Sequence, residues 1–588
     1  MALPKRSYDV LVVGAGGSGL RSALELSRAG VSVAVISKVF PTRSHTVAAQ
    51  GGIGASLANM GEDHWLWHMY DTVKGSDYLG DQDAIEFMCR EAPEVVYELE
   101  HMGMPFDRNS DGTIYQRAFG GHTANFGEKP VQRSCCAADR TGHAMLHTLY
   151  QQNLALNTYF YIEWMAIDLI MAADGSCVGV LAMEIETGNF LNLNAKAVIL
   201  ATGGAGRIFR STTNAYINTG DGLGMCARSG IPLEDMEFWQ FHPTGVAGAG
   251  VLITEGVRGE GGILLNADGE RFMERYAPTL KDLAPRDFVS RSMDQEIKEG
   301  RGCGPKKDHV YLKLNHLGDE VIMKRLPSIR EIAIRFANVD PILDPIPVVP
   351  TIHYQMGGIP VDIHGRVVSC DDHGCDVPIH GLYAVGECSC VSVHGANRLG
   401  TNSLLDLVVF GRSTARHVIK FVSSEPEFFP DLPKNASEES LDRINCLKGR
   451  SSGENVYSVL SMIQDVMQDH CAVFRRGDIL SSGVQKIMDL NSMVDNIAVH
   501  DKSAVFNTAL VEALELQNMI EVAKSTMVSA LLRQESRGAH ARDDCPDRDD
   551  ENWMKHSLYF SKGNRVSYKR VRSDPLTVDR FMPKPRVF

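Results

Sequence analysis

Long hydrophobic runs and an excess of basic residues are both missing from this sequence of 588 residues. No run of about 18 apolar residues occurs, so no segment is predicted to span a bilayer, and membrane attachment would require another polypeptide. The formal net charge of −14 argues against nucleic acid as a partner, because phosphates demand a basic surface. An anionic substrate remains compatible with this charge, since a local group of Arg and His can reverse the field within one cleft.

Cysteine patterns that bind metals are also missing. The 13 cysteines are odd in number and scattered along the chain. Only Cys135 with Cys136 and Cys388 with Cys390 lie close together, and neither pair has the spacing of an iron–sulfur cluster or a structural zinc site. We therefore predict no metal site in this chain, and we interpret these cysteines as buried small hydrophobic residues in a reducing compartment.

A targeting sequence is the third feature that we do not find. Met1 to Tyr8 lead almost at once into an apolar run, without a signal sequence or an arginine-rich presequence. We expect the protein to stay where it is made or to have lost a presequence already. Its hydrophobic content of 44% and charged content of 22% are typical of a globular protein, and its length allows more than one core.

A glycine-rich motif follows the first apolar run. Gly14, Gly16 and Gly19 have the spacing GxGxxG, which permits a tight turn, close approach of the backbone to a pyrophosphate, and close helix packing. A helix from about Ser18 to Arg28 would direct its free N–H groups at the phosphates. With a second strand at Val31 to Ile36, the sequence predicts a dinucleotide-binding unit.

The cofactor of this unit is predicted to be FAD. The second strand ends in Ser37 and Lys38, where a NAD-binding protein would carry an acidic residue for the adenosine ribose, so NAD is disfavoured. Two later segments, Ala197 to Gly206 and Gly381 to Glu387, are also apolar strands that run into glycine. Together they indicate one discontinuous cofactor domain of the glutathione reductase type, with Glu387 near the ribityl or ribose hydroxyls.

His45 lies in a polar and glycine-containing run that begins at Lys38 and ends at Gly52. This position places an imidazole beside the bound cofactor. A hydrogen-bonded loop histidine is the alternative explanation, and spacing alone favours that alternative.

The rest of the chain divides into parts that differ in composition and in hydrophobic periodicity. The predicted fold class is α/β, a Rossmann-like FAD-binding domain with an inserted α+β capping domain, a helical domain and an extended C-terminal domain. Helical periodicity is clear in three segments, at residues 83–101, 456–469 and 503–534. The tail is interpreted as an extended, polar surface element. The predicted parts are residues 1–237 and 353–435 (FAD-binding), 238–352 (capping), 436–534 (helical) and 535–588 (C-terminal).

Five further sites combine rare residue types with turn chemistry. They are His242, Thr254 with Glu255, Arg286, His353 and Arg398. If the two domains close over one cleft, their side chains could bind both ends of a small dicarboxylate, for which the planar arginine fork is well suited. Taken singly, each site also has a purely structural explanation. A histidine before proline, as at His242, is often a turn residue, and Arg286 could form a surface ion pair. Arg398 could cap a helix, and Thr254 with Glu255 could simply mark a turn. Only the joint pattern favours function.

At these residues the sequence resembles the flavoprotein subunits of succinate dehydrogenase and fumarate reductase. The resemblance extends from Tyr8 to Trp553 and is carried by specific motifs, at residues 43–52, 242–245, 254–262 and 395–400. It implies covalent attachment of His45 to the FAD 8α-methyl carbon. It further implies cofactor contacts through Gly14, Ala15, Gly16, Gly17, Ser18, Gly19, Ser37, Lys38, Thr42, Ser44, Thr46, Gln50, Gly51, Gly52, Asp221, Glu387, Ser403 and Leu404.

The resemblance also assigns roles in the reaction. His242, Thr254, His353 and Arg398 bind the substrate carboxylates, Arg286 transfers the proton, and Glu255 aligns Thr254 and the proton relay. The implied reaction removes a hydride and a proton from adjacent carbons of succinate, giving fumarate. A guanidinium normally stays protonated, so a basic role for Arg286 requires a dry cleft or a neighbouring cation such as Arg398.

Three other functions remain as alternatives. A fumarate reductase shares nearly every motif, although Gln50 favours the succinate-oxidising group. L-aspartate oxidase relatives lack the histidine that links the flavin. A flavin-binding structural or assembly subunit would not need the complete set of His, Thr and Arg residues.

The resemblance finally implies partners and a location. They are an iron–sulfur subunit that receives electrons, membrane-anchor subunits carrying quinone, and an assembly factor that promotes flavin attachment. The expected location is the cytoplasmic face of a bacterial inner membrane, where the chain would be peripheral and held by its partners.

Overall fold

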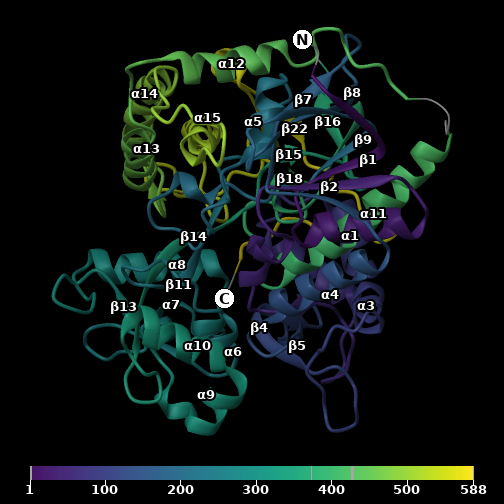
Figure 1. Cartoon of the computed structure of the whole chain (residues 1–588). Coiled ribbons are helices and arrows are strands. Elements are labelled where there is room, and N and C mark those ends of the chain that lie inside the picture. Colours follow the sequence, from purple (N-terminus) through teal and green to yellow (C-terminus); the bar gives the residue numbers. More distant parts are fainter. Residues whose placement is uncertain (1–2, 372–373, 425–428, 587–588) are drawn as a thin grey trace.

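The computed structural model describes residues 3–371, 374–424 and 429–586 (Figure 1). A sheet of eight strands forms its centre, in the order β16-β17-β9-β1-β2-β6, with β8 paired to β9 and β7 paired to β8. The strands are β1 (Lys5–Val13), β2 (Val33–Ser37), β6 (Tyr159–Ile162), β7 (Trp164–Met171), β8 (Cys177–Glu184), β9 (Phe190–Leu200), β16 (Arg366–Cys370) and β17 (Asp376–Ala384).

The middle of this sheet is parallel and buried. β1 pairs with β2 and with β9, and β9 pairs with β17, all in parallel. Val10, Leu11, Val12 and Val13 are buried, which fits the continuous apolar run expected where helices cover both faces of a parallel sheet. The three strand-to-glycine segments of the sequence are therefore neighbours in the middle of this sheet, as predicted for one discontinuous cofactor domain.

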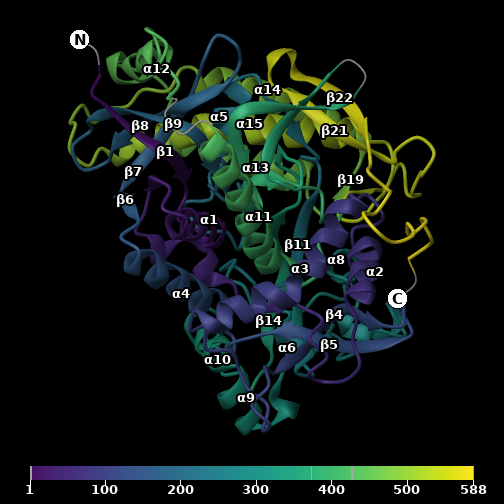
Figure 2. The same cartoon turned by 90° about the vertical axis from the view of Figure 1, so that its right-hand side faces the viewer.

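Helices from distant parts of the chain cover the sheet. α1 (Gly17–Arg28) packs against α4 (Thr141–Ala155) and α11 (Asn402–Ser424), which α3 (Gln82–His101) also contacts (Figures 1 and 2). The predicted helices at 18–28 and 83–101 are confirmed. Further elements of the cofactor-binding part are α2 (Trp65–Gly75), β3 (Ile53–Gly54), β4 (Gln116–Ala124), β5 (Lys129–Cys135), α5 (Asp221–Arg228), β15 (Ile359–Pro360) and β18 (Ser389–Cys390).

A second hydrophobic core lies in the capping part, at the lower left of Figure 1. Its sheet has the order β11-β14-β13-β12. Its elements are β11 (Trp239–Val246), α6 (Gly256–Gly259), β12 (Ile263–Leu265), α7 (Met273–Tyr276), α8 (Arg286–Lys298), β13 (Val310–Lys313), α9 (Asp319–Arg325), α10 (Pro327–Ile332) and β14 (Ile346–Gln355).

β11 and β14 belong to both cores. Phe241 and Ile352 pack into the main core, whereas Val246 and Val348 pack into the second core. The two strands are antiparallel neighbours and therefore connect the cap to the cofactor domain. The boundaries at 238 and 352 stay a prediction, because the strands continue through both cores.

A group of helices forms the upper left of Figure 1. It consists of α12 (Glu438–Gly449), α13 (Val456–His470), α14 (Gly477–Val494) and α15 (Thr508–Leu532). α15 packs on α13, α14 and α5, so it joins this group to the cofactor domain. The predicted helical segments at 456–469 and 503–534 are confirmed. Within the described residues, no helix has the length and apolarity needed to cross a membrane.

The start of the C-terminal part differs from the sequence prediction. Arg533, Glu535 and Arg537 are buried and paired: Arg533 Nη1 lies 3.0 Å from Glu535 Oε1, and Arg537 Nε lies 2.8 Å from the same oxygen. The expectation of a polar surface element is wrong here, because opposite charges neutralise each other inside the protein. Two small sheets join this part to earlier segments. One consists of β10 (Leu233–Glu234), β21 (Lys555–Phe560) and β22 (Arg565–Arg570), and the other of β19 (Phe474–Arg475) and β20 (Ala541–Arg542).

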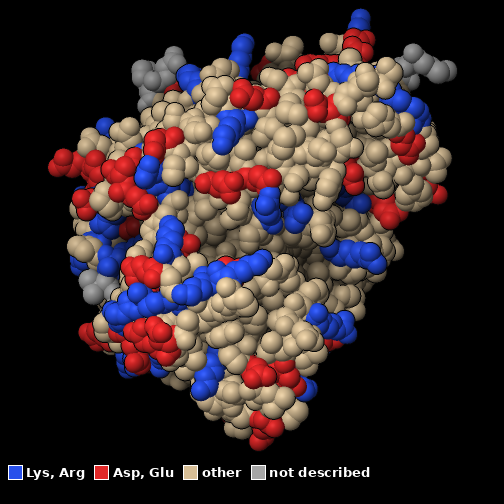
Figure 3. All heavy atoms as spheres, turned by 90° about the vertical axis from the view of Figure 1, so that its left-hand side faces the viewer, with Lys and Arg blue, Asp and Glu red and all other residues tan. Residues whose placement is uncertain are grey.

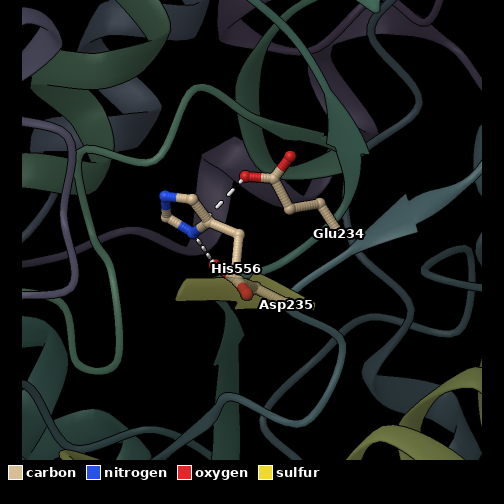
Figure 4. Close-up of side chains that lie close together, drawn as sticks. All are labelled: Glu234, Asp235 and His556. Carbon is tan, nitrogen blue, oxygen red and sulfur yellow. Dashed lines mark hydrogen bonds and ion pairs between the residues drawn. The ribbon is translucent and has the colours of Figure 1, made fainter. Parts of the chain in front are cut away.

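A buried imidazole holds this part against the cofactor domain. Figure 4 shows His556 of β21 facing the carboxylates of Glu234 and Asp235, with Nδ1 2.6 Å from Asp235 Oδ2. Nε2 lies 3.2 Å from Asp81 Oδ1, before α3. Burial opposes the charge on His556, but the surrounding carboxylates outweigh it and raise its pKa to about 10. His556 therefore acts as a buried cation that joins β10, β21 and the start of α3.

Residues 571–586 form an extended strap along the outside (Figure 2). Arg586 Nη2 lies 2.6 Å from Asp287 Oδ2 on α8 and 3.2 Å from Asp77 Oδ2, which follows α2. The strap thus ties the cap to the cofactor domain. On the face drawn in Figure 3, acidic and basic side chains are interspersed, so the net negative charge is not concentrated there.

Candidate active site

One large cavity collects most of the residues singled out in the sequence. Its volume is about 1530 Å³, including open solvent at its mouth. The predicted residues that line it are Gly14, Ala15, Gly16, Gly17, Ser18, Ser37, Lys38, Ser44, His45, Thr46, Gln50, Gly51, Gly52, Asp221, His242, Thr254, Arg286, His353, Glu387, Arg398, Ser403 and Leu404. Gly19, Thr42 and Glu255 are not among its lining residues.

The glycine loop at one end has the shape expected of a phosphate cradle. A Cβ on Gly14 would lie 2.1 Å from the Ala201 oxygen, and a Cβ on Gly19 would lie 2.0 Å from the Gly14 oxygen. Those glycines therefore let β1, α1 and β9 pack closely. A Cβ on Gly16 would meet nothing nearer than 3.5 Å, so this glycine leaves backbone open to the cavity. The start of α1 is thereby available to a phosphate.

Lys38 occupies the place where a NAD-binding protein has an acidic residue. Its Nζ lies 2.8 Å from Asp221 Oδ2 and 2.5 Å from Glu515 Oε1. Burial opposes the charge, but the two carboxylates outweigh it and raise the pKa of Lys38. Asp221 also accepts a hydrogen bond from Thr219 Oγ1 (2.8 Å), so its carboxylate is already partly engaged. This end of the cavity is consistent with an adenosine ribose bound without an acidic anchor.

His45 lies farther along the same wall. The backbone N–H of Ala215 donates to its Nδ1 (3.4 Å), so Nδ1 is unprotonated and Nε2 is the nitrogen that carries the proton. Burial lowers the pKa of His45 to about 4, and the ring is therefore neutral at physiological pH. The lone pair of the neutral ring lies on Nδ1, so bond formation at Nε2 requires loss of the Nε2 proton.

Two histidines face each other at the other end. His242 on β11 and His353 on β14 have ring centroids 4.9 Å apart. Burial, with the positive charge of Arg286, lowers the pKa of both rings well below the ordinary value. The N–H of Thr244 donates to His242 Nδ1 (3.2 Å), so Nε2 carries the proton. Within the described part of the chain, this buried Nε2 has no hydrogen-bond partner.

Two guanidinium groups converge beside the histidines. Arg286 Nη1, at the start of α8, and Arg398 Nη2 each donate to Gln240 Oε1 at 3.0 Å. Arg398 also lies over the ring of Tyr354, 4.4 Å from its centre. Burial, together with the charge of Arg286, lowers the pKa of Arg398 to about 9. Among the described residues, its buried Nε has no partner. A carboxylate would satisfy this donor.

Glu255 lies behind the cavity wall rather than in it. Its Oε2 accepts from Arg286 Nε (2.6 Å), and its Oε1 accepts from the N–H of Gly120 (3.1 Å). The Oε1 atom lies 3.8 Å from Arg258 Nη2. Next to Glu255, Thr254 Oγ1 accepts from the N–H of Gly256 (3.2 Å), so its hydroxyl proton is available to the cavity. Arg286, Glu255 and Arg258 thus form a continuous row of charged side chains.

Glu387 lies between the two ends. Its Oε1 accepts from the backbone N–H of Gln355 (3.1 Å), and burial raises its pKa to about 7. A carboxyl group titrating near neutrality can either donate or accept a hydrogen bond, as needed beside sugar hydroxyls. The cysteine pairs at 135–136 and 388–390 are buried, as predicted, and all 13 cysteines are free thiols.

Sequence reasoning did not identify several residues of the cavity and its support. Gln240 bridges the two arginines, Thr213 contacts His353, and Phe119 packs against Gly51. Gln240 lies only two residues before His242 on the same strand, and this closeness in sequence could have identified it. Thr213 had none, because its contact with His353 spans 140 residues.

The arrangement is suited to an anionic ligand next to a dinucleotide. One end offers two neutral imidazoles, two arginines and a hydroxyl, several with unused donors. Such donors suit two carboxylates, because a carboxylate only accepts hydrogen bonds. The other end offers glycine backbone and a helix start, which suit a pyrophosphate. Both lie in one cavity, so a ligand at the first end would meet the ring system of a ligand at the second.

Comparison with known proteins agrees with this geometry. The FAD binding domain family matches residues 9–404, and the fumarate reductase flavoprotein C-terminal family matches residues 461–588. A succinate dehydrogenase flavoprotein subunit of Coxiella burnetii is 54% identical, with 99% of each chain covered. A fumarate reductase flavoprotein subunit of a Serratia strain is 40% identical, with 99% of this chain and 96% of the relative covered. The structure of a mutant E. coli quinol fumarate reductase has a TM-score of 0.91, 38% identity and 99% of each chain covered.

Proposed function

Because the chain belongs to the succinate dehydrogenase and fumarate reductase flavoprotein family, we propose that it oxidises succinate to fumarate as the FAD-containing subunit of a succinate:quinone oxidoreductase. The proposal depends mainly on one observation: side chains that can donate hydrogen bonds to carboxylates lie beside a dinucleotide cradle in the same cavity. The higher identity to a succinate dehydrogenase subunit, 54% against 40% for a fumarate reductase subunit, favours this direction. Gln50 favours it too.

FAD fits the residues that are present. The cradle formed by Gly14, Gly16 and Gly19 would hold the pyrophosphate, and Glu387 would bond to hydroxyls of the ribityl chain or ribose. The remaining contacts are proposed for Ala15, Gly17, Ser18, Ser37, Lys38, Thr42, Ser44, Thr46, Gln50, Gly51, Gly52, Asp221, Ser403 and Leu404. Thr42 is not among the residues that line the cavity, in contrast to the others.

His45 is proposed to carry the flavin covalently through the 8α-methyl carbon. Its ring is neutral, its Nδ1 is engaged by Ala215, and Nε2 is thus the atom left for bond formation. The FAD binding domain match supports the cofactor, while the covalent bond depends on this local chemistry. A covalent bond at this carbon raises the reduction potential of a flavin, which favours oxidation of a saturated diacid.

Substrate binding is proposed for His242, Thr254, His353 and Arg398. The unpartnered Nε2 of His242 and Nε of Arg398 each supply a donor to a carboxylate oxygen. The opposed histidines and arginines can hold both ends of a four-carbon diacid and thereby fix its central carbons. Bound FAD supplies the two-electron acceptor that takes up a hydride equivalent from succinate.

Arg286 is proposed to take the proton from the neighbouring carbon. It is buried, and the Glu255 carboxylate orients it through Nε. Its Nη1 and the Nη2 of Arg398 share the Gln240 oxygen as acceptor, which places the two guanidinium groups side by side. A proton received at Arg286 can move along Glu255 toward Arg258, whose guanidinium is 3.8 Å from Glu255 Oε1.

Electrons must then leave the chain. We propose an iron–sulfur subunit as the acceptor and membrane-anchor subunits carrying quinone as the next partners, in line with the quinol fumarate reductase to which this fold is similar. An assembly factor for flavin attachment is a further proposed partner. The proposed location is the cytoplasmic side of a bacterial inner membrane, with attachment through those subunits.

A combined measurement tests the proposal. The purified protein should reduce an artificial dye with succinate, and malonate, a diacid that cannot be dehydrogenated, should inhibit it competitively. The tryptic peptide that contains His45 should carry the added mass of FAD. Dye reduction by aspartate but not succinate, with an unmodified peptide, would instead support L-aspartate oxidase. A fumarate reduction rate far above the succinate oxidation rate would support fumarate reductase.

A further inference from the structure

A hydroxyl group outside the proposed catalytic set contacts one of the substrate-binding histidines. Thr213 Oγ1 lies 3.0 Å from His353 Nδ1. We propose that Thr213 is a positioning residue that fixes His353 as the tautomer with its proton on Nε2, and so selects a carboxylate as the ligand. This inference rests on the proposed function, because it assumes that His353 binds the substrate.

The direction of this hydrogen bond follows from the neighbouring carbonyl of Ile352. Thr213 Oγ1 has two possible acceptors, His353 Nδ1 at 3.0 Å and the Ile352 oxygen at 3.3 Å. A carbonyl oxygen has two lone pairs. The N–H of Thr213 already donates to the Ile352 oxygen at 2.8 Å, which engages the first.

The hydroxyl of Thr212 engages the second lone pair. Thr212 Oγ1 lies 3.3 Å from the Ile352 oxygen, and it also accepts from the N–H of Asn214 at 3.1 Å. Because that amide must donate, the Thr212 proton goes to the carbonyl. The hydroxyl proton of Thr213 is therefore left for His353 Nδ1, and the His353 proton lies on Nε2.

The two histidines then present matched chemistry. His242 has its proton on Nε2 because the N–H of Thr244 donates to Nδ1. Both rings are neutral because burial and Arg286 lower their pKa values well below the ordinary value. The opposite tautomer of His353 would turn a lone pair instead of an N–H toward a carboxylate, and two acceptors repel each other.

The backbone around Thr213 is held independently of its hydroxyl. The segment at 211–213 pairs with β14, since Ile352 N donates to the Ser211 oxygen at 3.0 Å. Asn214 Nδ2 donates to the His353 oxygen at 2.9 Å. Removal of the hydroxyl alone should therefore leave Thr213 and His353 in place and change only the proton arrangement.

The test compares Thr213→Val, which keeps the shape, with Thr213→Ser, which keeps the hydroxyl. Thr148→Val is the matched control, because Thr148 is a buried threonine on α4 whose hydroxyl bonds only to the local Ala144 carbonyl at 2.9 Å. We expect Thr213→Val to raise the KM for succinate and the Kd for malonate about three- to tenfold, with kcat changed less than about twofold. The serine and control variants should resemble the wild type.

A double-mutant cycle shows whether Thr213 acts through His353. In a His353→Ala background, Thr213→Val should have no further effect on malonate binding. An equal effect in both backgrounds, or equal malonate affinity of the valine and serine variants, would overturn the inference. If the valine variant does not fold, Thr213→Ala replaces it in the same cycle. Absence of succinate oxidation by the wild type would instead overturn the proposed function.

Discussion

Replacement of Gln240 by Met should weaken the active site, although it leaves the charges and the reacting groups intact. Gln240 is fully buried, and its Oε1 accepts from Arg286 and Arg398 at 3.0 Å each. Its Nε2 donates to Asn397 Oδ1 (2.9 Å) and to the Arg398 carbonyl (2.7 Å). Methionine has a similar length but makes none of these four bonds.

The expected loss of activity can be calculated from the interactions of the two arginines with Gln240. Unit charges about 6 Å apart repel by about 3 kcal/mol at an effective dielectric constant of about 20, and the Gln240 carbonyl dipole opposes this repulsion. Each hydrogen bond from a charged donor contributes about 1.5–3 kcal/mol, and water can replace part of it. We expect a net loss of about 2–4 kcal/mol in transition-state binding, which is a fall in kcat/KM of about 30- to 1000-fold.

The assay is dye reduction by succinate, with the flavin content measured by absorbance. Gln355→Met is the matched control: Gln355 is a buried glutamine on β14 whose Nε2 donates to the Gly357 carbonyl (2.9 Å) and which does not line the cavity. It should keep kcat/KM within about threefold. The reasoning is refuted if Gln240→Met binds flavin fully and also keeps kcat/KM within that range.

Three further variants test separate parts of the structure. Gly19→Ala should abolish FAD binding, because its Cβ would lie 2.0 Å from the Gly14 oxygen, whereas Gly449→Ala, with nothing within 4 Å, should retain the normal ratio of flavin to protein. Arg286→Lys should abolish succinate turnover while malonate still binds; near-normal turnover would exclude Arg286 from the mechanism. His556→Gln should lower stability by about 3–5 kcal/mol near pH 6. Since the pKa of His556 is raised from 6.5 to about 10, its contribution is complete below about pH 6.5 and is lost toward pH 10, so urea midpoints of the two proteins should converge there.

Local sequence patterns predicted the cofactor domain well. The apolar run before Gly14 forms β1, and the predicted helix at 18–28 is α1 (Gly17–Arg28), since strand burial, glycine geometry and helix periodicity are short-range properties. The same holds for α13 and α15. The candidate residues His242, Arg286, His353 and Arg398 meet in one cavity, as the joint pattern suggested.

Other features depend on contacts that no local pattern contains. Gln240 belongs to the site only because Arg286 and Arg398 reach it from other elements. The charged residues Glu535 and Arg537 are buried, since they neutralise each other, whereas their composition predicted a polar surface. A sequence reveals a charge but not the distance to its partner, and that distance decides whether burial is tolerated.

The strand pair β11 and β14 has a consequence for motion. The two strands are shared by both cores, so any rotation of the cap must bend or twist them. His242 and His353 lie on this axis and would therefore travel little, whereas Thr254, which follows β11 in the cap, would move farther. Opening would thus separate the Thr254 hydroxyl from the two imidazoles, so a single movement of the cap would dismantle the donor set that we propose for the diacid.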